Sequence, residues 1–136
     1  MTLLYPAQVT QLTLAELATL TVADGKDVVH VPCDLKLFRV RMYVGTTGTG
    51  SGNVDATVYY TKPSDGITAT GDLWTVASGV GRIAYNASAK YLEWDADSLL
   101  ITNIEAGGTL SLNVDTISTA PANLVIHLLG IPINAS

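Results

Sequence analysis

A two-residue alternation of apolar and polar side chains is the clearest pattern in this sequence. Residues 36–44 place one set of side chains on one face of an extended chain, namely Phe38, Val40, Met42 and Val44. The opposite face carries Leu37, Arg39, Arg41 and Tyr43. Residues 54–60 repeat the pattern, with Val54, Ala56, Val58 and Tyr60 on one face. This period is that of a half-buried β-strand, so we predict two strands whose first-named faces point to the core.

The segment between these strands is rich in glycine. Residues 45–53 contain four glycines among nine residues. Glycine adopts the positive φ angles of tight turns, and such a segment between two alternating runs is typical of a hairpin loop. The sequence therefore predicts that strands 36–44 and 54–60 are neighbours in one sheet.

Further strands are expected along most of the chain. We predict them at residues 27–31, 73–76, 82–85, 91–94, 99–104, 110–116 and 123–133. Turn-forming residues separate them, at 23–26, 62–66, 86–88, 106–108 and 118–121. Many short strands spaced in this way predict an all-β fold, either a sandwich or a barrel.

The N-terminal part of the chain allows two interpretations. Residues 12–20 fit a short helix or a strand, and we favour a strand or extended arm. Ahead of them lie Leu3, Leu4 and Tyr5, which would be costly to leave in water. We therefore divide the chain into residues 1–22, an N-terminal arm or edge segment, and residues 23–136, a single sandwich domain. The arm would reach a neighbouring subunit, whereas the edge segment would pack on its own domain.

Charged side chains are scarce. They make up 14% of the 136 residues, against about 25% in ordinary globular domains, while hydrophobic residues make up 48%. Interface cores are depleted in charged residues, so this composition favours a subunit of an assembly over a monomer with a Thr- and Ser-rich surface. The net charge of −5 argues against nucleic acid as a partner. We expect no membrane span and no signal peptide, and hence a soluble protein made in the cytosol.

Few residues are equipped for chemistry. The chain has two histidines, His30 and His127, and one cysteine, Cys33. His30 lies among valines and His127 among leucines, as expected for histidines on half-buried strands, and Cys33 is expected to be a small buried side chain. We expect no enzymatic activity, no cofactor and no metal site.

Three possible ligand sites are weaker than their structural alternatives. Residues 48–52 are glycine-rich like a phosphate loop, but a strand and not a helix is predicted to follow. Glu93, Asp95 and Asp97 alternate and could hold Ca²⁺, although a solvated strand end or a polar subunit contact is favoured. Glu93 and Asp95 are also the one plausible carboxylate pair for a glycosidase.

Aromatic side chains offer a sugar-binding alternative. Trp74, Trp94 and several tyrosines lie on or near predicted strands and could stack on a carbohydrate. Packing in the core or in an interface is the favoured role for most of them.

Two arginines lie on one strand face. Arg39 and Arg41 are two of only seven basic residues and share that face with Tyr43. Arginine forms interface ion pairs better than lysine does, so this face could meet an acidic partner such as another subunit, or could simply face solvent. The candidate interface residues are Leu3, Leu4, Tyr5, Arg39, Arg41 and Tyr43.

One longer pattern resembles a protein family. The stretch VPCDLKLFRVRMYVGTTGTG at residues 31–50, followed by NVDATVY at 53–59, is similar to small phage virion proteins. In these a Pro-x-Asp start leads into a long strand, a Gly-Thr-rich hairpin and a Val-Asp-containing strand. The stretches IEAGGTLSLNVD at 104–115 and LVIHLLG at 124–130 resemble its second half, so that about residues 27–131 are covered.

This resemblance implies a jelly-roll-like antiparallel β-sandwich in the virion. Such modules serve as capsid cement or decoration proteins that bridge major capsid protein subunits, or occur in tail and receptor-binding proteins. We expect the first role, with a homotrimer on the capsid surface made in the host cytoplasm; the alternative is a tail or carbohydrate-binding module. The chain departs from the common form at Cys33, where a bulky aromatic is usual, and in a longer insert at residues 65–90.

Overall fold

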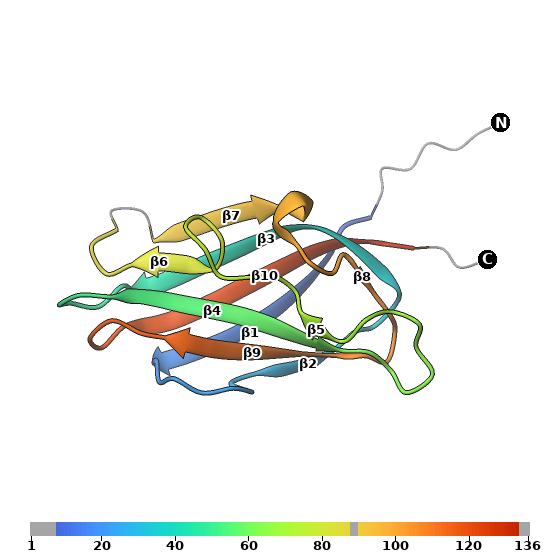
Figure 1. The fold of residues 1–136 in the computed structure, drawn as a ribbon, viewed down its shortest axis with the longest axis horizontal. Helices are drawn as coiled ribbons and strands as arrows, with labels where there is room; N and C mark the ends of the chain where they lie inside the picture. Colours follow the sequence, from blue (N-terminus) through green and yellow to red (C-terminus); the bar gives the residue numbers. More distant parts are fainter. Residues whose placement is uncertain (1–7, 88–89, 134–136) are drawn as a thin grey trace.

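Two stacked antiparallel sheets make up the part of the protein that the computed structural model describes, residues 8–87 and 90–133 (Figure 1). Sheet A has the order β1 (Thr10–Thr19), β10 (Ala122–Pro132), β3 (Leu35–Thr46) and β7 (Tyr91–Asp95), with β8 (Asn103–Ile104) also paired to β3. Sheet B has the order β2 (Val28–His30), β9 (Thr109–Thr116), β4 (Asn53–Thr61) and β5 (Gly71–Asp72), with β6 (Arg82–Ala84) also paired to β4. A three-residue 3-10 helix, η1 (Ala96–Ser98), follows β7.

Strands change sheets from one to the next at the start of the chain. β1 and β3 lie in sheet A, whereas β2 and β4 lie in sheet B, and the last strands β9 and β10 are inserted between these early strands. This interleaving of the two halves of the chain is the strand order of a jelly roll, in which two Greek keys form a double sheet. The predicted all-β, jelly-roll-like antiparallel sandwich is confirmed.

The predicted hairpin at residues 45–53 is wrong. β3 and β4 lie in different sheets, so this loop crosses the sandwich from sheet A to sheet B. Positive φ angles at Gly48, Gly50 and Gly52 let the chain turn there. The loop also pairs with the β9–β10 connection, since the Thr49 and Thr119 amides each donate to the other residue's carbonyl, at 2.9 and 3.1 Å.

A β-bulge changes which residues of β3 reach the core. Leu37 is paired with Gly130 and Arg39 with Leu129, so Phe38 has no partner on β10. An extra residue of this kind shifts the alternation by one position. Leu37 is therefore fully buried and Phe38 only half-buried, contrary to the prediction from strict alternation. Beyond the bulge, Val40, Met42 and Val44 are buried as predicted.

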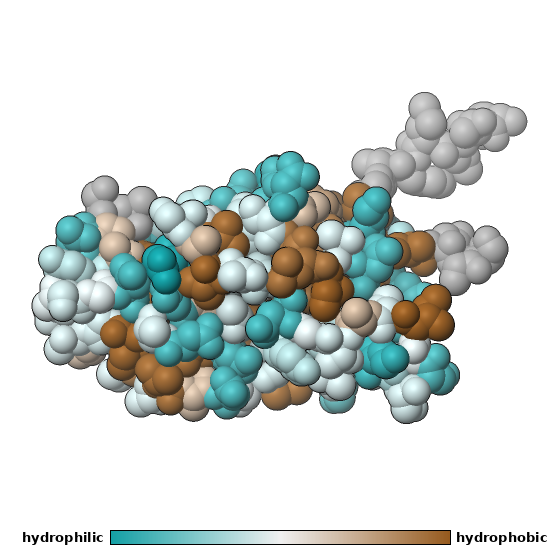
Figure 2. Space-filling model, viewed as in Figure 1, coloured by the Kyte–Doolittle hydropathy of each residue, from teal (hydrophilic) through white to brown (hydrophobic). Residues whose placement is uncertain are grey.

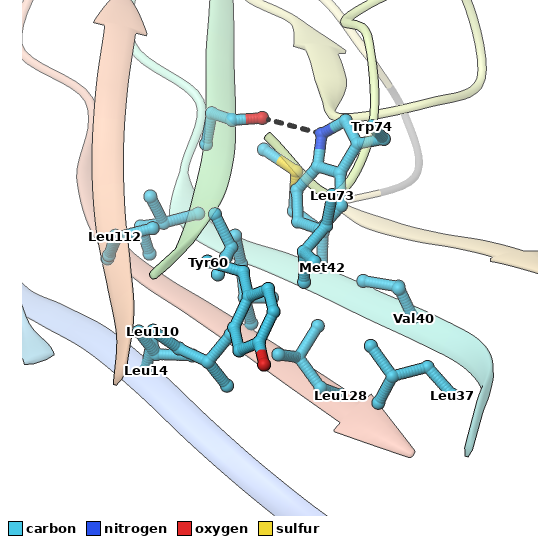
Figure 3. Close-up of a cluster of buried hydrophobic side chains, with 14 of the residues drawn as sticks. Leu14, Leu37, Val40, Met42, Tyr60, Leu73, Trp74, Leu110, Leu112 and Leu128 are labelled. Atoms are coloured by element: carbon cyan, nitrogen blue, oxygen red, sulfur yellow. Dashed lines mark hydrogen bonds between the residues drawn. The ribbon is translucent and has the colours of Figure 1, made fainter. Parts of the chain in front are cut away.

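The core lies between the two sheets and is continuous (Figure 3). All four predicted inward residues of β4 are completely buried. Trp74 is the largest of the fully buried side chains, and its Nε1 donates a hydrogen bond to the Ala56 carbonyl at 3.0 Å, as Figure 3 shows. Its ring meets that of Trp94 edge to face, with centroids 5.0 Å apart.

Two apolar segments predicted as strands are mainly irregular. Residues 73–76 follow the short strand β5, and Leu73 and Trp74 are buried outside any ladder. Of residues 99–104, only β8 is a strand. The Leu73 carbonyl accepts from the Leu100 amide at 2.7 Å, which joins the two segments. Most apolar side chains of these two segments pack in the core, although most of the residues are not part of a β-sheet.

The ambiguous segment near the N-terminus is a strand. β1 pairs with β10 from Thr10 opposite Gly130 to Thr19 opposite Ala122 and forms one edge of sheet A. Residues 10–19 thus form an edge strand of sheet A. Leu3, Leu4 and Tyr5 lie outside the described residues. Within the described part of the chain, no helix has the length and apolarity needed to cross a bilayer.

Candidate interface surface

The surface of sheet A that faces away from the core brings the predicted interface residues together. Strand register aligns Thr13, His127, Arg41 and Glu93 in one row across β1, β10, β3 and β7. The next row contains Ala15, Val125, Tyr43 and Tyr91. We call this surface the outer face of sheet A. Arg39, Arg41 and Tyr43 all lie on it, as the alternation of β3 predicted.

Glu93 contacts both arginines of this face. Its Oε1 lies 3.2 Å from Arg39 Nη1, and its Oε2 accepts from Arg41 Nε at 2.9 Å. The Tyr91 hydroxyl also donates to Glu93 Oε2. The hydrogen bond from Tyr91, followed by that from Arg41, lowers the pKa of Glu93. The same contact with Glu93 raises the pKa of Arg41. One carboxylate thus contacts two guanidinium groups within the chain, and the three side chains together keep a net charge of +1.

The sequence pattern did not predict that Glu93 pairs with both arginines. It predicted that Arg39 and Arg41 share a face, but it offered them an acidic partner on another molecule. Glu93 lies opposite Arg41 only because β7 pairs with β3, and the two residues are 52 positions apart. Nothing in the local pattern specifies that register. Both arginines therefore already have an acidic partner within the chain, which reduces the positive charge of this group from two to one.

An aromatic cluster lies beside the ion pairs. The Tyr43 ring is 4.7 Å from the Tyr91 ring and 5.8 Å from the His127 ring, measured between centroids. His127 Nδ1 and the Thr13 hydroxyl are 3.0 Å apart and hydrogen-bonded. Burial, with the nearby charge of Arg41, lowers the pKa of His127. Tyrosine, arginine and histidine are thus gathered on one sheet face, and tyrosine and arginine are enriched at interface hot spots.

The two tryptophans do not serve as a sugar platform. Trp74 is fully buried and Trp94 is 6% exposed, so neither ring can stack on a carbohydrate. Of the tyrosines that could have joined them, Tyr59 and Tyr91 are exposed, Tyr85 is half-buried and Tyr60 is buried. This corrects the alternative that placed both tryptophans in a binding site.

The acidic run at residues 93–97 is divided by the end of a strand. β7 ends at Asp95, whose Oδ1 accepts from the Asp97 amide at 3.0 Å and caps η1. Among the described residues no group of three possible ligands is placed to hold a metal ion. The lowered pKa of Glu93 is the opposite of what a glycosidase general acid needs.

The structure also shows where the glycine-rich loop, Cys33 and His30 lie. The glycine-rich loop at 48–52 leads into strand β4, which is not the strand-to-helix geometry of a phosphate loop. Cys33 is a half-buried free thiol, and His30 is exposed on β2.

In sheet B, the largely buried Asp55 accepts from Arg82 Nε at 2.9 Å and from Nη2 at 3.0 Å. This bidentate pair was not predicted.

Exposed apolar side chains are scattered and not gathered in a hollow. Figure 2 shows one face of the molecule, where brown apolar residues form small separate patches among pale and teal ones. The most exposed large ones come from different places along the chain, namely Leu17, Ile67 and Leu100. No pocket forms within the described residues. The candidate site is accordingly a surface.

Comparisons with known proteins bear on the fold. No family model matches the sequence, and no curated protein matches it. The structure is similar to a chain in the solved capsid of Ralstonia phage GP4, with a TM-score of 0.60 and 16% sequence identity. The match covers 99% of this chain and 92% of that chain. At this identity, the two chains are shown to share a fold, and that fold spans nearly the whole of each.

Proposed function

We propose that this protein is a structural, non-catalytic subunit of a phage virion. In its specific form the proposal is a cement or decoration protein that assembles as a homotrimer on the capsid surface. It would be made in the host cytoplasm and would bridge subunits of the major capsid protein. The observation that carries the proposal is the sandwich shared over 99% of the chain with a chain of a phage capsid.

The composition of the surface supports this role. Only 14% of residues are charged, and on the outer face of sheet A both arginines already form ion pairs with Glu93. A face whose charges are paired loses less solvation energy on contact than one with isolated charges. Burying its aromatic and uncharged surface would contribute about 25 cal/mol per Å² of apolar area before the costs of association. Repetition over a shell would then multiply a modest contact.

The experiment compares two matched tyrosines. Tyr43 and Tyr59 are each 39% exposed, Tyr43 on the outer face of sheet A and Tyr59 on sheet B. Capsids of the parent phage stripped of this protein would be incubated with wild type, Tyr43→Glu or Tyr59→Glu, and binding measured by co-sedimentation. Wild type should bind, Tyr43→Glu should bind at least about tenfold more weakly, and Tyr59→Glu should bind like wild type.

Three outcomes would contradict parts of this proposal. Absence of wild-type binding to capsids would contradict the capsid role. Loss of binding with Tyr59→Glu alone would assign the contact to sheet B. Location of the protein in the tail by imaging of the virion, together with glycan binding, would instead favour the receptor-binding alternative, which the burial of both tryptophans does not support.

A further inference from the structure

β1 is the longest strand at any edge of the two described sheets. It has ten residues, whereas β7 has five, β2 three and β5 two. An edge strand presents unpaired backbone donors and acceptors, and proteins usually shorten, cover or charge such edges. β1 is long and carries one charged residue, Glu16, near its C-terminal end.

The pairing with β10 shows which backbone groups face outward. In an antiparallel ladder, alternate residues direct both their N–H and C=O groups away from the partner strand. The Ala15 amide donates to Asp27 Oδ2 at 2.9 Å instead of to β10, so Ala15 is an outward-facing residue. Gln11 and Thr13 have the same parity in an uninterrupted register and face the same way.

Asp27 divides the edge into a capped and an open part. Its carboxylate covers the edge at Ala15, whereas Gln11 and Thr13 have exposed side chains. Within the described residues, no backbone group pairs with residues 10–13 on the side away from β10. Residues 8–15 contain no charged side chain, so an added strand would meet no charge here.

We propose that this open part of β1 binds residues 2–5 of a neighbouring copy of the chain as an added strand. Four residues are the length of the open stretch, and Leu3, Leu4 and Tyr5 supply apolar side chains for both faces. Pro6 favours an extended conformation at the residue before it. Backbone hydrogen bonds would provide the affinity, as in other cases of β-strand addition.

A neighbouring copy is favoured over the chain's own N-terminus. To pair with its own β1, the segment would have to reverse within residues 6–9. A two-residue hairpin loop is excluded because residues 6–9 contain no Gly, Asn or Asp for the positive φ angles that it needs, so a return would use all four residues as a loop. The scarcity of charged side chains, which is typical of interface cores, favours the neighbouring copy. Exchange of such segments in one direction around a ring is compatible with three-fold symmetry. The inference therefore deepens the proposed trimer but does not depend on capsid binding.

A proline substitution tests the edge without breaking the existing ladder. Gln11 directs its N–H outward, so Gln11→Pro removes a donor that β10 does not use, a position where edge strands tolerate proline. The control, Gln11→Thr, keeps the N–H. In analytical ultracentrifugation of the full chain, Gln11→Pro should raise the dissociation constant of self-association by at least about tenfold, and Gln11→Thr should not. Circular dichroism would verify folding of both variants.

Cross-linking distinguishes a neighbouring copy from the same chain. In a Cys33→Ser background, a chain with Leu4→Cys would be mixed with a chain with Gln11→Cys and treated with a short bis-maleimide. A covalent heterodimer is expected, and replacing Gln11→Cys by Thr75→Cys, at an exposed site beyond β5, should abolish it. A link formed only inside a chain that carries both cysteines, or a wild-type protein that stays monomeric, would overturn the inference. A link within one chain would leave the proposed function untouched, whereas a monomer would also contradict the proposed homotrimer. In both cases the capsid-binding experiment decides the capsid role separately.

Discussion

Single residues on the outer face of sheet A depend on partners far away in the sequence. The shared face of Arg39, Arg41 and Tyr43 follows from alternation and was predictable. Their surroundings were not, because Glu93, Tyr91 and His127 arrive from β7 and β10 through strand register. Local sequence shows on which face a side chain lies; long-range pairing determines what that side chain touches.

His127 should make stability depend on pH. Burial and Arg41 lower its pKa in the folded state, so the folded protein binds this proton less readily than the unfolded chain does. Stability should therefore be unaffected well above the ordinary histidine pKa of about 6.5 and should fall as pH decreases through that value. Besides Arg41, the groups in contact with the ring are Tyr43 and Thr13.

The measurement is the melting temperature at pH 7.5 and at pH 5. His127→Gln should reduce the acid-induced drop by on the order of 2 °C, since glutamine does not titrate. His30→Gln, on the exposed strand β2, controls for the loss of an imidazole elsewhere. An identical drop in wild type and His127→Gln would show that His127 does not contribute.

At the scale of elements, alternation predicted the main strands but not their neighbours. β3, β4, β9 and β10 lie where the pattern indicates, because each has one face in the core. The loop between β3 and β4 was assigned to a hairpin from its glycines, yet glycine permits a crossing between sheets as readily as a reversal within one. The bulge at Phe38 was equally invisible, since it arises from the pairing of β3 with β10.

The crossing loop should be sensitive to a single methyl group. At Gly48 φ is +86°, and an added Cβ would lie 2.5 Å from the Thr119 carbonyl oxygen and would also collide with the Ser118 hydroxyl. At Gly79 φ is +84°, but no heavy atom lies within 4 Å of such a Cβ. The two positions share the conformational strain and differ in the steric clash.

Chemical denaturation of the two alanine variants should separate these effects. Gly79→Ala should lower the free energy of unfolding by about 1 kcal/mol, the cost of a non-glycine residue at positive φ. Gly48→Ala should lower it by about 3 kcal/mol or more, because the loop must also move away from the β9–β10 connection. Equal losses would mean that the contact between the two loops is readily displaced.

At the scale of the whole molecule, the jelly roll and the scarcity of charge act together. The sandwich buries one face of each sheet and leaves the other available, and few of the available side chains are ionised. The number of strands made a sandwich or barrel predictable from the turns. The strand order was not, because it depends on which distant segments cover one another.

This surface should give an association that is nearly independent of salt. Exposed, uncompensated charges are screened over about 10 Å at 0.1 M salt, whereas apolar burial is not weakened by added salt. Binding to capsids should change less than about threefold between roughly 50 mM and 500 mM NaCl. A steep loss of affinity with salt would show that Arg39 and Arg41 engage acidic groups on the partner despite Glu93.

The edge-to-face contact of Trp74 and Trp94 joins the two layers of the sandwich, since Trp74 follows β5 of sheet B and Trp94 belongs to β7 of sheet A. These are the only two indoles in the chain. Their fluorescence emission should therefore report on the spacing between the two sheets. An increase in this spacing on heating, or a decrease on binding to a capsid, can then be followed by tryptophan fluorescence without an added dye.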